Sequence, residues 1–524
     1  MKLLYNARVY TLDRERPVAS ALVIDRGEVL AVGGEELVSG FAGAGRQDLG
    51  GRVVLPGLTD AHLHLHHYSL GLQKVDCETA TLEECLQRVA ERARSASNGE
   101  WVLGHGWNQN TWGGWPSAAD IDRLIPDQPV YLTAKSLHAA WANSAALKLA
   151  GITASTPDPQ DGVIQRDDRG QPTGILLESA VALVAELVPE PDISGLADAI
   201  EKAQPTLWKL GLTGVHDFDR RESFMALQKL RNEHRLKLRV TKSIPLELLD
   251  HADALGLGSG FGDDWLHIGS VKAFMDGALG PRTAAMFEPY AGEPENRGIL
   301  NMDGEQLFEH GRRAADVGLG LAVHAIGDRA NHEVLAAYEH LRRYETEKSL
   351  PHLRHRIEHV QVLHPDDVSR LAQLDIIASM QPIHATSDML MADKYWGDRT
   401  AYAYALKSQL EAGAHVAFGS DAPVESPNPF WGIHAAVTRR RVDGSPGPDG
   451  WHPEQRLAIQ QALEGFTLGP AYAGYAENRQ GRLAPGYLAD LIVLEKDPFA
   501  CEPAEVKDLQ SSATMVAGEW VFEA

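Results

Sequence analysis

VVLPGLTDAHLH, residues 53–64, joins an apolar run to two histidines, His62 and His64. The apolar run predicts a buried strand that ends at the histidines. Because successive side chains alternate across a strand, residues two positions apart point to the same side. Both imidazoles can therefore reach one metal ion, although an isolated pair of this kind is weak evidence for a metal site.

Seven further apolar segments follow, and amphipathic helical stretches separate most of them. The segments are TGVHDF (213–218), LRVTKSI (238–244), IGSVKAFMD (268–276), GLAVHAIG (320–327), HRIEHVQ (355–361), IIASMQP (376–382) and HVAFGSD (415–421). Eight strands that alternate with helices predict an α/β fold, a TIM-like (β/α)₈ barrel.

The two ends of the chain differ from this middle part. Residues 1–56 and 481–524 contain short alternating segments broken by glycine, which predict one small β-sandwich domain built from both termini. Residues 68–191, between the first and second strands, are too many for a connecting loop. We expect an inserted subdomain there, within a barrel that spans residues 57–480.

Six polar residues fall at or near the C-terminal ends of the expected strands. They are His62, His64, Lys272, His324, His359 and Asp421. In a (β/α)₈ barrel these ends form the rim where catalysis takes place. Each residue alone has an ordinary structural explanation, but their occurrence together at strand ends indicates a functional site. Imidazole and carboxylate ligands suit zinc, with manganese, iron or cobalt as alternatives, and the set contains no thiolate.

The composition excludes several classes of function. The 524 residues include 49 Lys and Arg against 72 Asp and Glu, which gives a net charge of −23. This acidic balance argues against nucleic acid and against an anionic membrane surface as partners. The three cysteines lack metal-site spacing, and no apolar run reaches the ~18 residues of a membrane span. The start of the chain lacks a signal-peptide pattern. We therefore expect a cytoplasmic protein, with a homodimer as the default oligomer.

Several segments are similar to motifs of the amidohydrolase superfamily. They are LPGLTDAHLH (55–64), VKAFMDGALG (271–280), LAVHAIGD (321–328), RIEHVQ (356–361), GSDAPV (419–424) and APGYLADLIVLEKDP (484–498). GWNQNTW (106–112), PVYLTAKSLHAAWANSAAL (129–147) and GLTGVHDF (211–218) resemble the branch called amidohydrolase family 3, or YtcJ-like. That branch includes N-substituted formamide deformylase.

The resemblance implies a metal site with one or two ions. His62 and His64 would bind the more buried ion, and His324 and His359 the more exposed one. Lys272 would carry a carbamate formed with CO₂ and bridge the two ions, while Asp421 would bind the first ion and act as general base and acid. The implied activity is hydrolysis of a non-peptide C–N bond, of amide or formamide type, by a metal-activated hydroxide.

Three alternatives remain open. A deaminase on the same barrel typically has Glu three positions after the fifth-strand histidine, where this chain has Gly327. An ester or lactone hydrolase would use the same chemistry on another activated carbonyl. A catalytically silent scaffold would have lost metal ligands, whereas all six expected positions are occupied here.

The small-molecule substrate itself is not given by these patterns. Candidate substrate-binding residues are Trp107, Trp112, His138, His216, Asp276 and Arg282. Trp107 and Trp112 could form an apolar wall that selects a hydrophobic or aryl substituent. Alternatively, they form the core of the inserted subdomain. Arg282 could bind a substrate carboxylate or form a structural ion pair.

Overall fold

The computed structural model describes residues 1–97, 99–135, 138–160 and 162–524. The described chain divides into two compact units, one of Met1–Tyr68 with Ile200–Ala524 and the other of Ser69–Ala199. Residues 136–137 of the motif at 129–147 lie outside the described residues. The domain boundaries at residues 56/57 and 480/481 stay a prediction.

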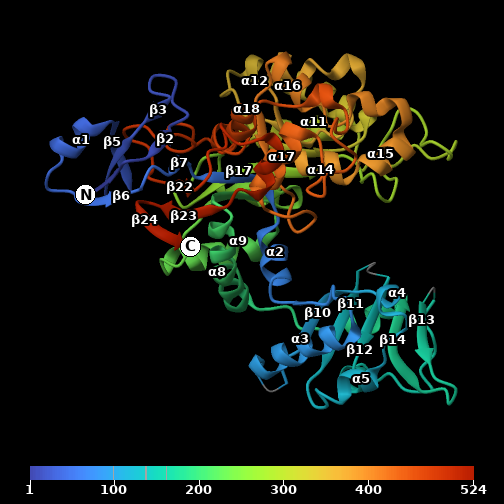
Figure 1. The fold of residues 1–524 in the computed structure, drawn as a ribbon. Helices are drawn as coiled ribbons and strands as arrows, with labels where there is room; N and C mark the ends of the chain where they lie inside the picture. The colour runs from blue at the N-terminus through green and yellow to red at the C-terminus, as the bar shows by residue number, and fades with distance from the viewer. Residues whose placement is uncertain (98, 136–137, 161) are drawn as a thin grey trace. The chain divides into compact units, whose positions relative to one another are not determined.

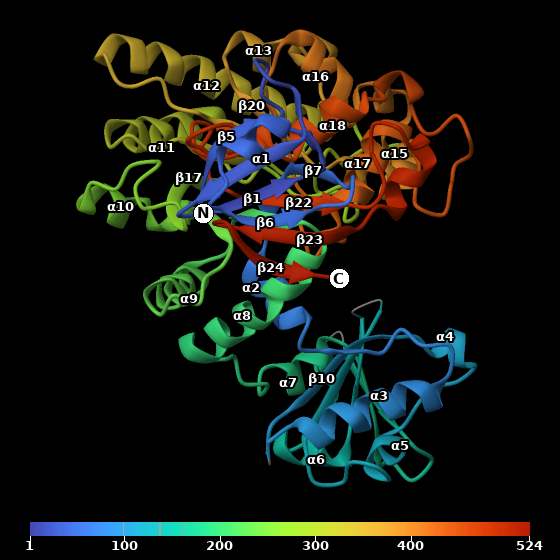
Figure 2. The same cartoon turned by 60° about the vertical axis from the view of Figure 1, so that its left-hand side comes forward.

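The first unit contains a barrel of eight parallel strands (Figures 1 and 2). In sheet order they are β8 (Leu58–Leu63), β15 (Leu212–Asp217), β16 (Arg239–Pro245), β17 (Leu266–Phe274), β18 (Leu321–Ala325), β19 (Arg356–His359), β20 (Ile377–Met380) and β21 (Val416–Phe418). A parallel bridge between Leu63 and Ala422 brings the last strand against the first. The predicted fold class is confirmed, and each predicted strand segment overlaps one of these strands.

Helices lie around the outside of the barrel strands (Figure 2). Between the strands they are α8 (Ile193–Lys209), α9 (Arg221–Asn232), α10 (Leu249–Leu255), α11 (Gly304–Asp316), α12 (Asp328–Lys348), α13 (Arg370–Gln373), α14 (Pro382–Ser387), α15 (Met389–Trp396) and α16 (Leu406–Ala412). After β21 follow α17 (Pro429–Thr438), α18 (Ile459–Gly465) and α19 (Leu468–Ala473), while α2 (Leu65–Gly71) follows β8. The local sequence determines where such a helix begins and which face it buries. Asp303 and Gln306 form a capping box that begins α11, and α11 buries Leu307 and Ala314.

Both termini contribute to a pair of packed sheets in the same unit. One sheet has the order β5-β4-β1-β6 and the other β24-β23-β22-β7-β2-β3. The strands are β1 (Lys2–Tyr5), β2 (Arg8–Tyr10), β3 (Val18–Ala19), β4 (Ala21–Asp25), β5 (Glu28–Gly33), β6 (Gly45–Asp48), β7 (Val53–Pro56), β22 (Leu491–Leu494), β23 (Ser511–Val516) and β24 (Glu519–Glu523), and helix α1 spans Glu35–Gly40. Leu22 and Ile24 of one sheet and Val54, Leu491 and Met515 of the other share one hydrophobic core. This is the predicted β-sandwich.

The stretch 53–64 is two strands rather than one. Its first part, β7, pairs with β22 in the sandwich, and its second part, β8, begins the barrel. The chain breaks between them at Gly57, where a Cβ atom would lie 2.3 Å from Thr213 Oγ1. Only glycine fits this approach, so Gly57 is required at the point where the apolar run divides into two strands.

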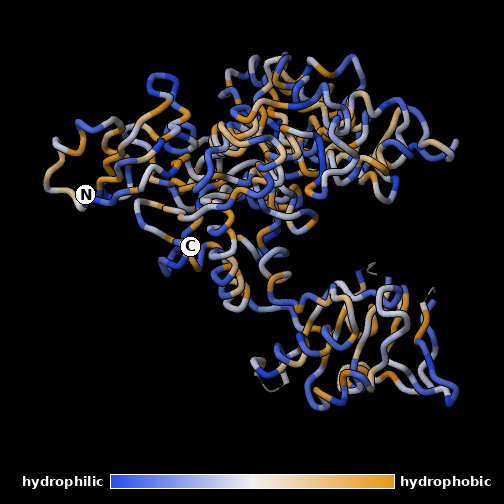
Figure 3. Tube along the Cα trace, viewed as in Figure 1, coloured by the Kyte–Doolittle hydropathy of each residue, from blue (hydrophilic) through white to orange (hydrophobic). Residues whose placement is uncertain are grey.

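The second unit is a six-stranded sheet with its own helices. Its order is β13-β14-β12-β11-β10-β9. The strands are β9 (Val75–Asp76), β10 (Val102–Trp107), β11 (Val130–Ala134), β12 (Ala139–Ala142), β13 (Gly162–Arg166) and β14 (Pro172–Glu178), and the helices are α3 (Leu82–Ser95), α4 (Gln109–Trp112), α5 (Ala118–Asp122), α6 (Ser144–Leu149) and α7 (Ala182–Ala185). In both units, hydrophobic residues recur along the trace between hydrophilic ones (Figure 3). No helix in the described ranges combines the length and the hydropathy that a membrane crossing needs.

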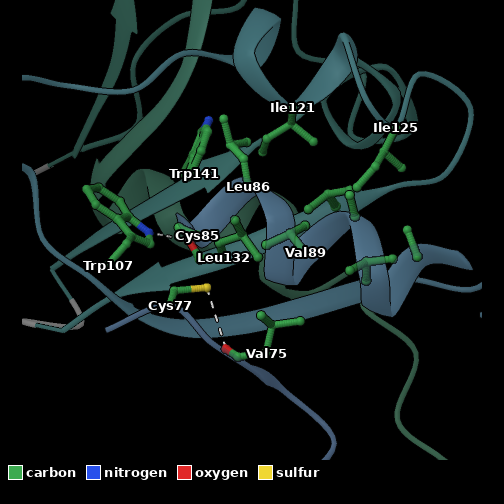
Figure 4. Packing of buried hydrophobic residues seen from close by; sticks show 14 of the residues in the cluster. Val75, Cys77, Cys85, Leu86, Val89, Trp107, Ile121, Ile125, Leu132 and Trp141 are labelled. Atoms are coloured by element: carbon green, nitrogen blue, oxygen red, sulfur yellow. Dashed lines mark hydrogen bonds between the residues drawn. The ribbon is translucent and has the colours of Figure 1, made fainter. Parts of the chain in front are cut away.

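Trp107 lies in the core of the second unit (Figure 4). Its side chain is 0% exposed, and its Nε1–H donates to Leu132 O at 2.8 Å. The partly buried Trp112 packs on the same core and donates from Nε1 to Thr79 O at 3.1 Å. A side chain without exposed surface contacts no ligand in this arrangement. The placement favours the alternative in which these tryptophans form the subdomain core.

Trp107→Ala should therefore destabilise this unit by about 3–5 kcal/mol, because it removes a fully buried indole and leaves a cavity. Thermal unfolding followed by circular dichroism measures the loss. Leu149→Ala, at a residue of the same unit that is 60% exposed, is the control and should change stability little. An unchanged unfolding midpoint, together with a selective rise in KM for bulky aryl amides, would instead place Trp107 at the substrate.

Candidate metal centre

A cavity of about 400 Å³ opens at the C-terminal ends of the barrel strands. Its lining comprises His62, His64, Lys272, Phe274, Ala278, Leu279, Gly280, Pro281, His324, Ile326, His359, Gln361, His384, Asp388, Met391, Asp421, Val424 and Glu425. All six metal-site residues predicted from the sequence are among these. The barrel thus brings them to one cavity from five different strands or strand ends.

His62, His64 and Asp421 form the tightest group of candidate ligands. The Nε2 atoms of His62 and His64 lie 3.4 Å and 3.3 Å from Asp421 Oδ1. Donors bound at ~2.1 Å to one tetrahedral ion are separated by roughly this distance. Backbone strain accompanies the group, since Asp421 has φ 61° and His359 has φ 77°. Such strain clusters at functional sites, where the surrounding structure maintains it.

Each histidine is oriented by a contact to its other ring nitrogen. His62 Nδ1 lies 2.6 Å from Glu358 Oε2, and His64 Nδ1 lies 3.0 Å from Asp219 Oδ1. A proton on Nδ1 leaves the Nε2 lone pair of each ring free for a cation.

The histidines of the fifth and sixth strands, His324 and His359, are also each held by a contact to one ring nitrogen. His359 Nδ1 lies 2.8 Å from Gln381 Oε1. His324 is reversed, because its Nε2 lies 2.9 Å from Gly277 O, so Nδ1 is its free nitrogen. All four rings can therefore present one unprotonated nitrogen.

Charge and burial set the protonation of the group. Burial, with the charge of Lys272, lowers the pKa of His62 to about 4 and that of His324 to about 3. Burial alone would raise the pKa of Asp421, but the hydrogen bond from His64 and the charges of His62 and His359 hold it well below its usual range. For His64, burial is outweighed by Asp219 and Asp421, which raise its pKa to about 9. Without a bound cation, a proton on His64 thus balances the charge of Asp219 and Asp421. A bound metal ion would take over this role.

Lys272 is buried at the end of β17, with 4% of its surface exposed. Its Nζ lies 4.8 Å from the ring centre of Phe218 and 4.9 Å from that of Phe274. Within the described part of the chain, no carboxylate lies within ion-pair distance of this nitrogen. Burial lowers the pKa of Lys272 to about 8, so about one tenth of the amine is neutral at pH 7.

The candidate substrate-binding residues do not line this cavity. His216 is buried, and its Nδ1 lies 2.9 Å from Arg356 Nη1. Asp276 accepts backbone N–H groups of Ala285, Ile326 and Gly327, at 2.9, 3.0 and 2.8 Å. Both are structural contacts.

Arg282 and His138 each pair with a carboxylate. Arg282 Nε lies 3.1 Å from Glu293 Oε1, which is the ion-pair alternative considered from the sequence. His138 Nδ1, in the second unit, lies 2.9 Å from Glu178 Oε2. A role for these residues in substrate binding stays a prediction.

The sequence patterns did not single out Glu358, Asp219 and His384. Glu358 precedes His359 in RIEH, and its signal was a carboxylate directly before a histidine at a strand end. Asp219 follows β15 in HDFD, at a strand end like the expected ligands. His384 lies in α14, just beyond the seventh strand, and forms a second possible ligand group with His359 and Asp421.

Comparisons with known proteins agree with this geometry. The model of the amidohydrolase family, Amidohydro_3, matches residues 47–522. The chain is 34% identical to the putative amidohydrolase YtcJ of Bacillus subtilis, with 98% of each chain covered. It is 29% identical to N-substituted formamide deformylase of Arthrobacter pascens, and the match covers 99% of this chain and 98% of the relative. A crystal structure of an uncharacterized metal-dependent hydrolase from Pyrococcus furiosus has 32% identity and a TM-score of 0.77, with 95% and 99% covered.

Glu358→Gln tests whether this carboxylate sets the metal affinity of the site. The amide keeps the shape but loses the charge that holds the proton on His62 Nδ1. We expect zinc affinity to fall about 10–100-fold, the usual effect of losing a contact behind a ligand. Zinc titration against a competing chelator measures it. Glu339→Gln, on the outer helix α12, is the control. Wild-type affinity in Glu358→Gln would contradict the role.

Proposed function

The chain belongs to the amidohydrolase family and is a hydrolase acting on carbon–nitrogen bonds, and we propose that it cleaves a non-peptide amide or formamide bond in the barrel cavity with a divalent metal as cofactor. The observation that carries the proposal is the convergence of His62 Nε2 and His64 Nε2 on Asp421 Oδ1, at 3.4 and 3.3 Å. Two neutral nitrogens and one carboxylate oxygen are ligands that suit zinc.

The residues present fit the proposed cofactor. His62, His64 and Asp421 would hold one ion. His324, His359 and a carbamate on Lys272 would hold a second. A divalent ion in this site lowers the pKa of a water molecule towards neutrality and polarises the substrate carbonyl. Zinc is the cofactor we propose, with manganese, iron or cobalt as alternatives.

Asp421 would move the proton in the reaction. Its carboxylate is ionised because the surrounding imidazoles hold its pKa low. While Oδ1 faces His62 and His64, Oδ2 faces the other side of the cavity, 4.0 Å from His384 Nε2. The carboxylate would accept a proton from the attacking water and deliver it to the leaving nitrogen, as a general base and then a general acid.

Lys272 is suited to become a carbamate. Its neutral amine would attack CO₂, form an N–C bond and release one proton, which leaves an anionic carboxylate on Nζ. The aromatic contacts of Phe218 and Phe274 do not compensate a full positive charge as a carboxylate would. The carbamate would replace a cation that repels metal ions by two anionic oxygens that bind them.

The geometry disfavours the deaminase alternative. Such an enzyme would need a glutamate at position 327, three residues after His324. A Cβ atom at Gly327 would lie 2.0 Å from Ala285 O, so no side chain fits there without movement of the backbone. The 29% identity to a formamide deformylase makes N-substituted formamides the first substrates to test.

The proposed function predicts hydrolysis of members of an N-formyl, N-acyl amino-acid and aryl amide panel by zinc-loaded protein. Asp421→Asn should lower kcat by about 10²–10⁴, because the amide keeps one oxygen ligand but accepts no proton. Product amine release measures the rate. Asp398→Asn, an exposed position, is the control. No hydrolysis of any amide by metal-loaded wild type would argue against the proposed function, and wild-type kcat in Asp421→Asn would place the base elsewhere.

Lys272→Ala tests the bridging carbamate. We expect loss of most activity and of part of the bound metal, because the anionic bridge is removed. Short carboxylic acids such as formate or acetate should partly restore both by occupying the vacated position. Activity and metal content are measured with and without the acid. Full activity and full metal content without added acid would exclude the bridge.

A further inference from the structure

His384 lines the cavity but belongs to neither of the proposed ion sites. It lies in α14, directly after β20, and its side chain is 6% exposed. Its Nε2 is buried and has no hydrogen-bond partner. The nearest carboxylate oxygen is Asp421 Oδ2, at 4.0 Å. An unpaired polar atom at such a depth is costly unless a ligand satisfies it.

His384 and His359 are held by matching contacts. Their rings are parallel, with 9° between the planes and 6.1 Å between the centres. His359 Nδ1 meets the amide of Gln381, and His384 Nδ1 meets the amide of Gln361 at 3.3 Å. Each glutamine comes from the strand end that carries the other histidine.

The Gln361 amide can orient His384 as a ligand. Its Oε1 is buried without a partner, while its Nε2 faces His384 Nδ1. A half-turn of this amide exchanges the two atoms and gives Oε1 the Nδ1–H of His384 as donor. The lone pair of His384 Nε2 is then free, as it is on His359 and on a metal-binding histidine in general.

The unpaired nitrogen lies among groups that could bind a cation. A metal ion lies at ~2.0–2.1 Å from a histidine nitrogen, and a second imidazole and a carboxylate are usual further ligands. The candidate ligand atoms of His359, His384 and Asp421 all lie within 4.8 Å of one another.

We propose that His359, His384 and Asp421 bind a divalent transition-metal ion, with Asp421 shared between this ion and the one held by His62 and His64. His384 Nε2 is the ligand that the set expected from the sequence lacks, and it comes from the seventh strand. The inference rests on the proposed function for the presence of metal and extends it to the ligands of the second ion.

Metal counting tests the proposal. Wild type, His384→Ala, His384→Gln and His64→Ala are stripped with a chelator, reloaded with zinc alone and analysed by plasma mass spectrometry and zinc titration. Wild type should bind two ions. Both His384 variants should lose one ion, or bind it at least ~10-fold more weakly, and keep the other. His64→Ala should lose the ion that the His384 variants retain. His415→Ala, outside the cavity, is the matched control and should bind as wild type.

Crystals of zinc-loaded wild type give a readout that does not depend on folding of a variant. A zinc-edge anomalous peak should lie within bonding distance of His384 Nε2. A peak on His359 that leaves His384 unbound, or full zinc binding by both His384 variants, overturns the inference while the proposed function stands. Two bound ions without hydrolysis of any amide overturns the proposed function and supports the inference. A wild type that binds no zinc overturns both.

Discussion

The closure of the barrel is the constraint on which the candidate site depends. Asp421 N–H donates to His62 O at 2.7 Å, and His64 N–H donates to Ala422 O at 2.8 Å. These two bonds hold the ends of the first and last strands together, although the chain separates them by more than 350 residues. Asp60 strengthens the closure, since its Oδ1 accepts the backbone N–H groups of His62 and Ser420, each at 3.0 Å. Asp421, the proposed shared ligand, therefore meets the histidine pair as a direct result of strand pairing.

A network of buried charge fixes the rings that the closure brings together. Glu358 lies 2.6 Å from His62 Nδ1 and 2.5 Å from Arg356 Nε, while His216 lies against Arg356. Burial alone would raise the pKa of Glu358, but Arg356 and His62 hold it well below its usual range. A charged carboxylate with two partners holds an imidazole more firmly than a single neutral contact does. Glu358, which directly precedes His359 in the sequence, thus orients the ring of His62 from another strand.

Local patterns predicted the barrel because its strands are apolar segments bounded by helices, a signal that each segment carries by itself. The break at Gly57 was not predicted, since both sides are apolar, and the close approach of Thr213, a residue far along the chain, is not visible in the local pattern. Spacing likewise placed the expected ligands at strand ends but did not say which strand-end side chains turn inward. The Asp276 carboxylate, at the end of such a strand, accepts backbone N–H groups, which spacing does not indicate. His384 was missed because it lies in the helical turn that follows its strand.

The partners of the buried ionic groups support the proposed binding of metal ions in the cavity. Two buried ionic groups elsewhere in the barrel unit are paired: Arg239 with Asp490 at 2.9 Å, and Lys242 with Asp217 at 3.0 Å. A buried charge without a partner is strongly destabilising, and pairing is the usual remedy. Lys272 has only aromatic neighbours, and His384 Nε2 has no hydrogen-bond partner, yet both line one cavity with Asp421. Carbamylation would give Lys272 a negative charge, and cations would then satisfy the carbamate, the imidazoles and the carboxylate together. The same atoms that the fold leaves unpaired are thus the ones that the proposed chemistry uses.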